Sequence, residues 1–255
     1  MKRLQLLNKK QRCLLHIAKH DNFIPYDKLN TNLNDWRQQY QQAEPFPHIC
    51  LDNIFDIELL NHIREEFPAP SKQTDWVTFR LENEWMKNAT EQDFQVPFFT
   101  RQFLYALNSR SFLAWLEKLT GIKGLIPDTE FIGGGLHATL PGGRLGVHVD
   151  FNKHQRNGLD RRINLLLYLN HDWNPDWGGA LELWDKQLTS CKQKIHPVFN
   201  RMVIFSTTNE SFHGHPDALN CPEHRVRQSI AMYYYTNGRP KSEMTASHLT
   251  NYADV

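Results

Sequence analysis

The second half of the chain alternates short apolar segments with turn residues, and this pattern limits the fold more than any other feature. From Glu130 onward, segments rich in Val, Ile, Leu, Phe and Tyr are separated by Gly, Pro, Asn and Asp. Such segments predict β-strands, which we expect at 130–139, 144–151, 162–170, 179–184, 195–205, 210–214 and 225–236. Many short antiparallel strands with Gly and Pro turns are typical of a sandwich or a barrel.

The N-terminal part of the chain carries helical patterns instead. Apolar residues at positions 6, 7, 14, 15, 17 and 18 lie near helical spacing, and a polar helix is expected over 27–42. Pro45 and Pro47 mark the end of this region. We therefore predict an N-terminal helical extension over 1–44. It would brace the barrel or an oligomer, with the gathering of substrate as the alternative role.

The segment between the extension and the strand-rich half predicts scaffold. Residues 46–55 predict a strand, and the residues after it a helix that runs to about Phe67 and is capped by Asp56. Another strand is expected at 76–81, and two amphipathic helices at 98–108 and 111–119. The second of these helices starts at a serine cap and ends near Gly121.

Helices that precede a run of antiparallel strands pack together on one sheet. The expected fold is therefore α+β and mainly β: a double-stranded β-helix, the cupin-like jelly roll, flanked by helices. We assign residues 45–237 to this domain and residues 238–255 to a C-terminal tail. A chain of 255 residues can bury one large core, which favours one domain with an extension over two equal domains.

Charge and composition limit the cellular compartments and the classes of binding partner to be expected. The net charge is +1, so no nucleic-acid partner is expected. The longest apolar runs are far shorter than a membrane span, and the first ten residues lack the apolar core of a signal peptide. Four widely spaced cysteines do not make a disulfide scaffold. We expect a cytoplasmic protein in a reducing environment, with an oligomeric state that the sequence leaves open.

The strand expected at 144–151 carries an imidazole and a carboxylate on one face. Because side chains alternate along a strand, His148 and Asp150 point the same way and Val149 points the other way. The same spacing occurs at His215 and Asp217, but a proline lies between them, and we interpret that copy as a turn.

A second histidine can join this pair. His213 lies about 60 residues beyond Asp150, shortly after a strong apolar strand, and reaches the pair if the sheet folds back on itself. Two imidazoles and one carboxylate form a facial triad that holds Fe(II) and leaves the opposite positions open for substrate and oxygen. We therefore predict His148, Asp150 and His213 as metal ligands and catalytic residues.

The last predicted strand carries arginines that an anion would have to satisfy. Strand alternation places Arg225, Arg227 and Ser229 on one face, and a buried arginine is costly unless it meets an anion. The planar guanidinium suits a carboxylate, to which a serine two residues later can add a hydrogen bond. Arg227 is favoured over Arg225 because it alone pairs with Ser229 in an Arg-x-Ser pattern.

These motifs resemble those of the Fe(II)/2-oxoglutarate-dependent dioxygenases, in particular the prolyl-4-hydroxylase-like branch. The resemblance runs from about Pro45 to Tyr235 and includes His148-Val149-Asp150, His213 and Arg227-Gln228-Ser229. It also includes Tyr168-Leu169-Asn170, then Trp173, then Gly178-Gly179-Ala180-Leu181. By position, the family's tyrosine that helps to hold 2-oxoglutarate corresponds to Tyr168. The chain departs from the family at Leu140-Pro141 and in its additional His137 and His215.

The resemblance implies an enzyme, a dioxygenase that hydroxylates a C–H bond of a prolyl residue or an amino-acid-like substrate and releases succinate and CO2. It implies Fe(II), 2-oxoglutarate as cosubstrate and O2, with ascorbate as a further candidate cofactor. The distal carboxylate of 2-oxoglutarate would be held by Arg227 and Ser229. The substrate would be a peptide, a protein or a small molecule. The alternative is a cupin-like jelly roll with a different metal-dependent activity or a non-catalytic ligand-binding role.

Other polar residues near these motifs have plainer interpretations. His137, His154, His171 and His215 are expected at the surface or in support of the site rather than as metal ligands. The polar segment 152–161 is expected to be either a lid over the substrate or a solvated connection.

Overall fold

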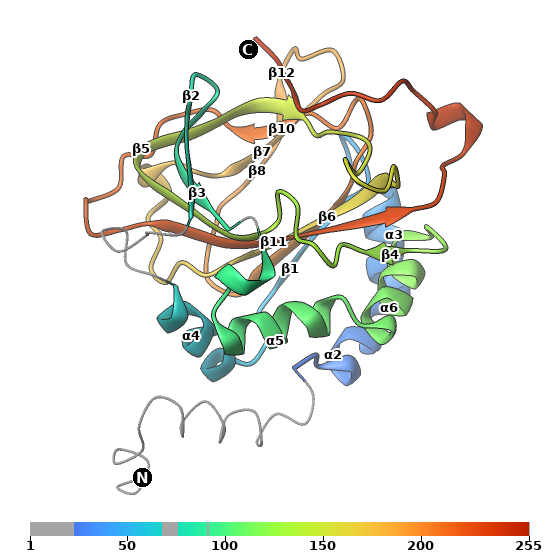
Figure 1. Cartoon of the computed structure of the whole chain (residues 1–255), viewed down its shortest axis with the longest axis horizontal. Helices are drawn as coiled ribbons and strands as arrows, with labels where there is room; N and C mark the ends of the chain where they lie inside the picture. The colour runs from blue at the N-terminus through green and yellow to red at the C-terminus, as the bar shows by residue number, and fades with distance from the viewer. Residues whose placement is uncertain (1–22, 68–75, 91, 255) are drawn as a thin grey trace, which may run out of the picture.

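The computed structural model of the chain describes residues 23–67, 76–90 and 92–254 (Figure 1). Its α-helices are α2 (Tyr26–Thr31), α3 (Leu33–Gln42), α4 (Ile57–Glu66), α5 (Phe98–Leu107) and α6 (Arg110–Thr120), and short 3-10 turns lie at Asp93–Gln95, Pro175–Trp177 and Lys241–Glu243. Its strands are β1 (His48–Asp52), β2 (Val77–Leu81), β3 (Glu84–Ala89), β4 (Ile126–Pro127), β5 (Gly135–Val149), β6 (Asp160–Tyr168), β7 (Leu181–Trp184), β8 (Cys191–Ile195), β9 (Arg201–Ser206), β10 (His213–His215), β11 (Arg227–Thr236) and β12 (Asn251–Tyr252).

The helices follow the sequence patterns closely, with two corrections. Asp56 caps α4 by accepting a hydrogen bond from the Leu59 amide (2.9 Å), as predicted. The cap of α6 is Ser109 rather than Ser111, because its hydroxyl accepts from the Phe112 amide (3.3 Å), and Gly121 ends the helix at a φ of 81°. The polar helix expected over 27–42 is interrupted at Asn32, between α2 and α3. The apolar positions 6–18 lie outside the described residues.

The strands form an antiparallel sheet that curls into a nearly closed barrel, with the order β1-β9-β6-β11-β5-β10-β7-β8. Strand β5 connects the two halves: its first part pairs with β11 and its second part with β10. Hairpin β2–β3 pairs with the outer side of β5, and β12 pairs with the end of β5. The prediction of a mainly β jelly roll flanked by helices is confirmed.

Two predicted strand boundaries are wrong, for backbone reasons. Residues 130–139 and 144–151 belong to one strand, β5, which begins only at Gly135 and continues through Gly142. The backbone stays paired across this turn-like sequence because Leu219 exchanges hydrogen bonds with Gly142 and Gly143 (2.8 and 3.0 Å). The strand expected at 195–205 is instead divided into β8 and β9 by the segment that contains Pro197.

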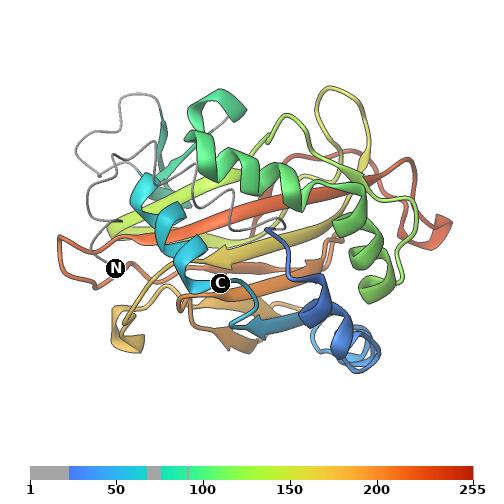
Figure 2. The same cartoon turned by 90° about the horizontal axis from the view of Figure 1, so that it is seen from below.

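The main core lies between the sheet and the helices, which cross one of its faces (Figure 2). Alternation along β6 and β11 directs every second side chain outward into this core: Ile163, Leu165, Leu167, Ile230, Met232 and Tyr234. The intervening residues face the interior of the barrel. Two smaller apolar clusters fill that interior and leave a pocket between them. Within the predicted N-terminal extension, Leu29 and Tyr40 are buried in this main core.

The side chain of Asn200, just before β9, connects this strand to the loop before α4 through two hydrogen bonds to the Phe55 backbone. This side chain donates to the Phe55 carbonyl (2.7 Å) and accepts from the Phe55 amide (3.1 Å), in a buried position with a φ of 60°. Asn200→Ala leaves both backbone groups unpaired and is expected to lower the free energy of unfolding by more than about 2 kcal/mol. Asn237→Ala, at an exposed position, is the control and should change it by less than about 0.5 kcal/mol. Equal denaturant midpoints for both variants would contradict this expectation.

Candidate active site

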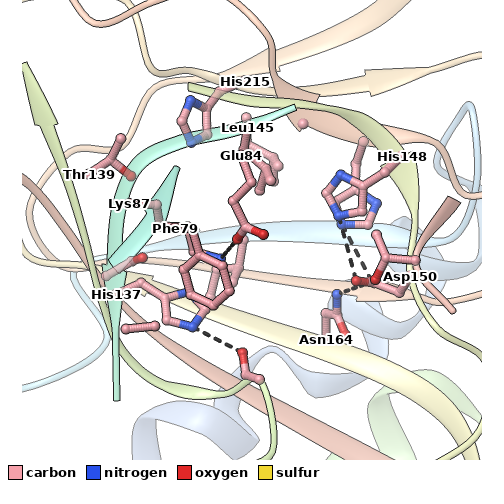
Figure 3. Close-up of a pocket in the computed structure, with 18 of the residues that line it drawn as sticks. Phe79, Glu84, Lys87, His137, Thr139, Leu145, His148, Asp150, Asn164 and His215 are labelled. Carbon is pink, nitrogen blue, oxygen red and sulfur yellow. Dashed lines mark hydrogen bonds and ion pairs between the residues drawn. The ribbon is translucent and has the colours of Figure 1, made fainter. Parts of the chain in front are cut away.

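The pocket inside the barrel collects most of the predicted site residues (Figure 3). Five of them line its wall: His148, Asp150, His213, Arg227 and Ser229. Tyr168 lies behind the wall, where its hydroxyl contacts Arg227. Residues that are about 80 positions apart in the chain are therefore neighbours here.

Three potential metal ligands converge at one end of the pocket. His213 pairs directly with His148 across β10 and β5, and Asp150 follows the end of β5. The Nε2 atoms of His148 and His213 lie 3.6 and 3.5 Å from the two carboxylate oxygens of Asp150. One ligand atom from each residue lies within 4.8 Å of the other two. The sheet therefore folds back on itself as the sequence requires, and it assembles two imidazoles and a carboxylate.

The Nδ1 atoms of both imidazole rings form hydrogen bonds that leave the Nε2 atoms available for a metal. The Nδ1 atom of His148 lies 2.8 Å from the Gly146 carbonyl, and that of His213 lies 2.9 Å from the Ser211 carbonyl. A carbonyl can only accept, so each Nδ1 carries the proton and each Nε2 presents its lone pair to the common point. Burial lowers the pKa of His213 to about 4 despite the nearby carboxylate, which keeps this ring neutral.

Arg227 brings a buried positive charge to the pocket. Its Nε donates to the Gly179 carbonyl (2.8 Å), and one Nη donates to the Tyr168 hydroxyl (3.3 Å). The side chain is 6% exposed, and no carboxylate among the described residues forms an ion pair with it. Ser229, two residues along β11, pairs with Tyr168 on the neighbouring strand. A buried guanidinium whose described partners are all neutral fits an anionic ligand.

Arg225 does not share this face. Strand β11 begins at Arg227, so strict alternation does not extend back to Arg225. The Arg225 guanidinium instead donates to the backbone carbonyls of His171 and Asp172 and lies over the Trp177 ring, 4.9 Å from its centroid. The expectation that Arg225 lies on the same face of the strand as Arg227 and Ser229 is therefore wrong.

Comparison with protein families identifies this arrangement. Residues 134–235 match the model of the 2OG-Fe(II) oxygenase superfamily, and this range contains all three potential metal ligands as well as Tyr168, Arg227 and Ser229. Over this range the chain is similar to that superfamily. The donor set of two imidazoles and one carboxylate fits Fe(II), and the buried guanidinium, whose described partners are all neutral, fits the carboxylate of 2-oxoglutarate.

Individual proteins to which this chain is similar include prolyl hydroxylases. Prolyl 3-hydroxylase OGFOD1 of Mus musculus is 28% identical over 200 residues, which are 75% of the chain and 33% of the relative. The chain thus spans about a third of that protein. Among solved structures, a Trichoplax adhaerens prolyl hydroxylase in complex with a hypoxia inducible factor peptide fragment has a TM-score of 0.61 at 15% identity. The similarity covers 82% of this chain and 91% of that one.

A solved structure with a small-molecule ligand has a similar fold. HygX from Streptomyces hygroscopicus, solved with nickel, 2-oxoglutarate and hygromycin B bound, has a TM-score of 0.54 at 12% identity. The similarity covers 84% of this chain and 96% of that chain. No helix in the described part of the chain is long and apolar enough to cross a membrane.

Two residues that the sequence interpretation missed hold the carboxylate of Asp150. Arg161 lies 3.1 Å from one carboxylate oxygen, and the Asn164 amide donates to the other (2.8 Å). Arg161 also donates to the Asn164 side chain and stacks on the ring of Tyr233, 3.5 Å from its centroid. Burial alone would raise the pKa of Asp150, but Arg161 and the two imidazoles hold that pKa well below its usual range.

A β-bulge explains why Arg161 was missed. Residues three apart on a regular strand point to opposite faces. On β6, however, the register with β11 shifts by one residue next to Arg162, so that Arg161 and Asn164 both face the pocket. Arg161 is 1% exposed, and the expectation that it ends a lid or a solvated loop is therefore wrong. Its signal in the sequence was Asn164, a polar residue within the apolar run of β6.

A second bulge shapes the mouth of the pocket. The register between β3 and β5 shifts between Trp85 and Lys87, and the intervening Met86 has a φ of 52°. Glu84 and Lys87, three residues apart, therefore both face the pocket and form an ion pair at 2.6 Å. The Lys87 ammonium also lies 5.2 Å from the centroid of the Phe79 ring. Hairpin β2–β3 thus lines the mouth with one carboxylate, one ammonium and one aromatic ring.

The C-terminal segment returns to the same mouth. Strand β12 pairs with the end of β5, which places the Tyr252 ring 5.4 Å from the ring of His148. The Tyr252 hydroxyl donates to Glu84 (3.4 Å), so the segment and hairpin β2–β3 meet across the opening. The sequence offered no signal for this role, because residues 238–255 have neither strand periodicity nor a recognisable motif.

The four additional histidines have different positions. Among the described residues none of them joins the metal-binding group, as expected. His154 is buried beside Asp128, and His171 stacks on Phe199. His137 and His215 are buried and line the pocket. The interpretation of His215 as part of a turn is wrong, because His215 is the last residue of β10 and pairs with Leu145. The strand ends before the proline that follows it.

Proposed function

We propose that this chain is an Fe(II)- and 2-oxoglutarate-dependent hydroxylase of a prolyl residue or an amino-acid-like substrate. The observation that carries the proposal is the joint presence, in one pocket, of a three-residue metal-binding group and a buried arginine without an anionic partner. A jelly-roll protein with another metal-dependent activity, or with a ligand-binding role only, has no need of the second feature.

The ligand roles follow from the contacts. His148 and His213 would bind Fe(II) through Nε2, and Asp150 through one carboxylate oxygen. Iron and 2-oxoglutarate together supply oxidative decarboxylation, in which O2, 2-oxoglutarate and a substrate C–H bond give succinate, CO2 and the hydroxylated product. Arg161 and Asn164 fix the orientation of the Asp150 carboxylate.

The cosubstrate would lie between the metal and Arg227. We assign its distal carboxylate to the free N–H groups of Arg227 and to the Ser229 hydroxyl. Tyr168 supports this site by fixing the guanidinium through its hydroxyl, as does the Gly179 carbonyl. The two fixed contacts orient the planar group before the cosubstrate arrives.

The substrate assignment draws on the relatives. The mouse relative is a prolyl 3-hydroxylase, and the Trichoplax enzyme was solved with a peptide fragment. HygX was solved with hygromycin B, which supports a small molecule as the alternative. A peptidyl proline is favoured because the mouse relative is 28% identical to the chain, against 12% for HygX.

The location and organisation of the chain complete the proposal. Cys50, Cys191 and Cys221 are free thiols, which supports a reducing, cytoplasmic environment. The division into an extension over 1–44, an oxygenase domain over 45–237 and a C-terminal tail over 238–255 stays a prediction. Ascorbate as an additional reductant also stays a prediction.

The test is a coupled assay with the purified chain. Anaerobic reconstitution with Fe(II) and addition of 2-oxoglutarate and O2 should release succinate, and the metal-free protein should release none. Peptide and metabolite libraries are then screened for a product that has gained one oxygen atom. Failure of the iron-loaded chain both to bind and to consume 2-oxoglutarate would overturn the proposal.

A further inference from the structure

His215 is a buried imidazole that the metal site does not use. It is 4% exposed, lines the pocket and follows the predicted ligand His213 by two residues on β10. Its Nδ1 is buried and has no hydrogen-bond partner among the described residues. Leaving a buried polar nitrogen unpaired costs about 1–3 kcal/mol, so such a group is expected to have a partner when the pocket is filled.

The strand register places His215 toward the arginine end of the pocket. His213 pairs with His148, whereas His215 pairs with Leu145, about 7 Å further along the strand. Arg227 pairs with Thr139, on the other side of the bend in β5. In Figure 3, His215 lies on the same side as Thr139, across the pocket from His148 and Asp150. His215 therefore lies away from the metal end of the pocket, on the side of the β5 residue that pairs with Arg227.

The nature of the missing partner follows from its neighbours. Arg227 already gives two of its N–H groups to Gly179 and Tyr168, which leaves three for a ligand. A carboxylate offers about four acceptor sites and therefore has room for a further donor. The other buried imidazole of the pocket, His137, is already bonded through Nε2 to the Gly133 carbonyl (3.0 Å). His215 is thus the imidazole whose ring nitrogen still needs a partner.

We propose that His215 donates a hydrogen bond to the 2-oxoglutarate carboxylate that Arg227 binds, and that it contributes to the selection of a cosubstrate with two carboxylates. The proposal rests on the function proposed above. In it, the distal carboxylate is held by a guanidinium, a hydroxyl and an imidazole, and β10 supplies both a metal ligand and a cosubstrate ligand.

The test measures binding rather than turnover. Protein loaded with Mn(II), with the metal content verified, is titrated by calorimetry with 2-oxoglutarate and with 2-oxopentanoate, which has the same chain but lacks the distal carboxylate. His215→Leu should raise the Kd for 2-oxoglutarate by about tenfold or more, the effect of one hydrogen bond to a charged group. It should leave the Kd for 2-oxopentanoate within about twofold.

A second variant tests the hydrogen bond itself. His215→Asn keeps an N–H donor near the position of Nδ1 and should recover most of the lost affinity for 2-oxoglutarate. Unchanged 2-oxoglutarate binding in His215→Leu would overturn the inference, as would an equal loss for both ligands, because the residue would then act on the metal site or the fold. If the unsubstituted protein fails to bind 2-oxoglutarate, the proposed function itself fails.

Discussion

Replacing His148 with alanine is expected to abolish Fe(II) binding and turnover while leaving the fold intact. The ring supplies one of three potential ligands, and its Nδ1 donates to the Gly146 carbonyl. Asp150→Ala is expected to lose the metal as well, but with an additional cost. It leaves the guanidinium of Arg161, 1% exposed, without its countercharge, which destabilises a protein by about 3–5 kcal/mol.

The two variants are compared by metal analysis after reconstitution, by succinate release and by thermal unfolding. We expect no iron and no activity in either, and a markedly lower Tm only in Asp150→Ala. His213→Ala is the matched control for a ligand without an arginine partner and should behave like His148→Ala. Normal iron content and activity in the variants would refute the assignment of the metal site.

The second large effect is expected at the cosubstrate end. Arg227→Ala should raise the KM for 2-oxoglutarate by about 100-fold or more, because it removes two charged hydrogen bonds of about 1.5–3 kcal/mol each. Arg225→Ala is the control and should change this KM little, since the Arg225 guanidinium contacts backbone carbonyls and the Trp177 ring outside the pocket.

A third variant distinguishes charge from geometry. Arg227→Lys keeps the positive charge but loses the planar pair of donors, so an intermediate KM is expected. The measurement is initial rates over a range of 2-oxoglutarate concentrations at saturating iron. A larger effect at Arg225 than at Arg227 would move the cosubstrate site to Arg225 and remove the role assigned to Ser229.

Local physical preferences made much of this fold predictable. A carboxylate before an apolar helix caps it, and Asp56 does so for α4. Strand alternation correctly placed Arg227 and Ser229 on one face of their strand, and both line the pocket. These features depend on residues close together in the chain, and for that reason they can be read from one sequence.

The wrong predictions of strand faces and of the bounds of β5 have a common cause in how the strands pair with one another. Bulges next to Arg162 on β6 and at Met86 on β3 turn residues three apart onto one face, and alternation cannot anticipate them. Strand β5 stays continuous because distant residues around Leu219 pair with its turn-like segment. Each of these depends on hydrogen bonds between segments that are distant in sequence.

For this protein, the sequence alone predicted the type of fold, the three potential metal ligands that the barrel brings together and the arginine that lines the pocket. It could do so because each ligand motif is short and belongs to a strand with a clear pattern. Only the tertiary structure decided what surrounds these residues: Arg161 on the Asp150 carboxylate, Tyr252 from the C-terminal segment at the mouth, and His215 without a partner. The physical reason is that burial and pairing are properties of the closed barrel, and a residue's neighbours across it are set by register and bulges rather than by its neighbours in the chain.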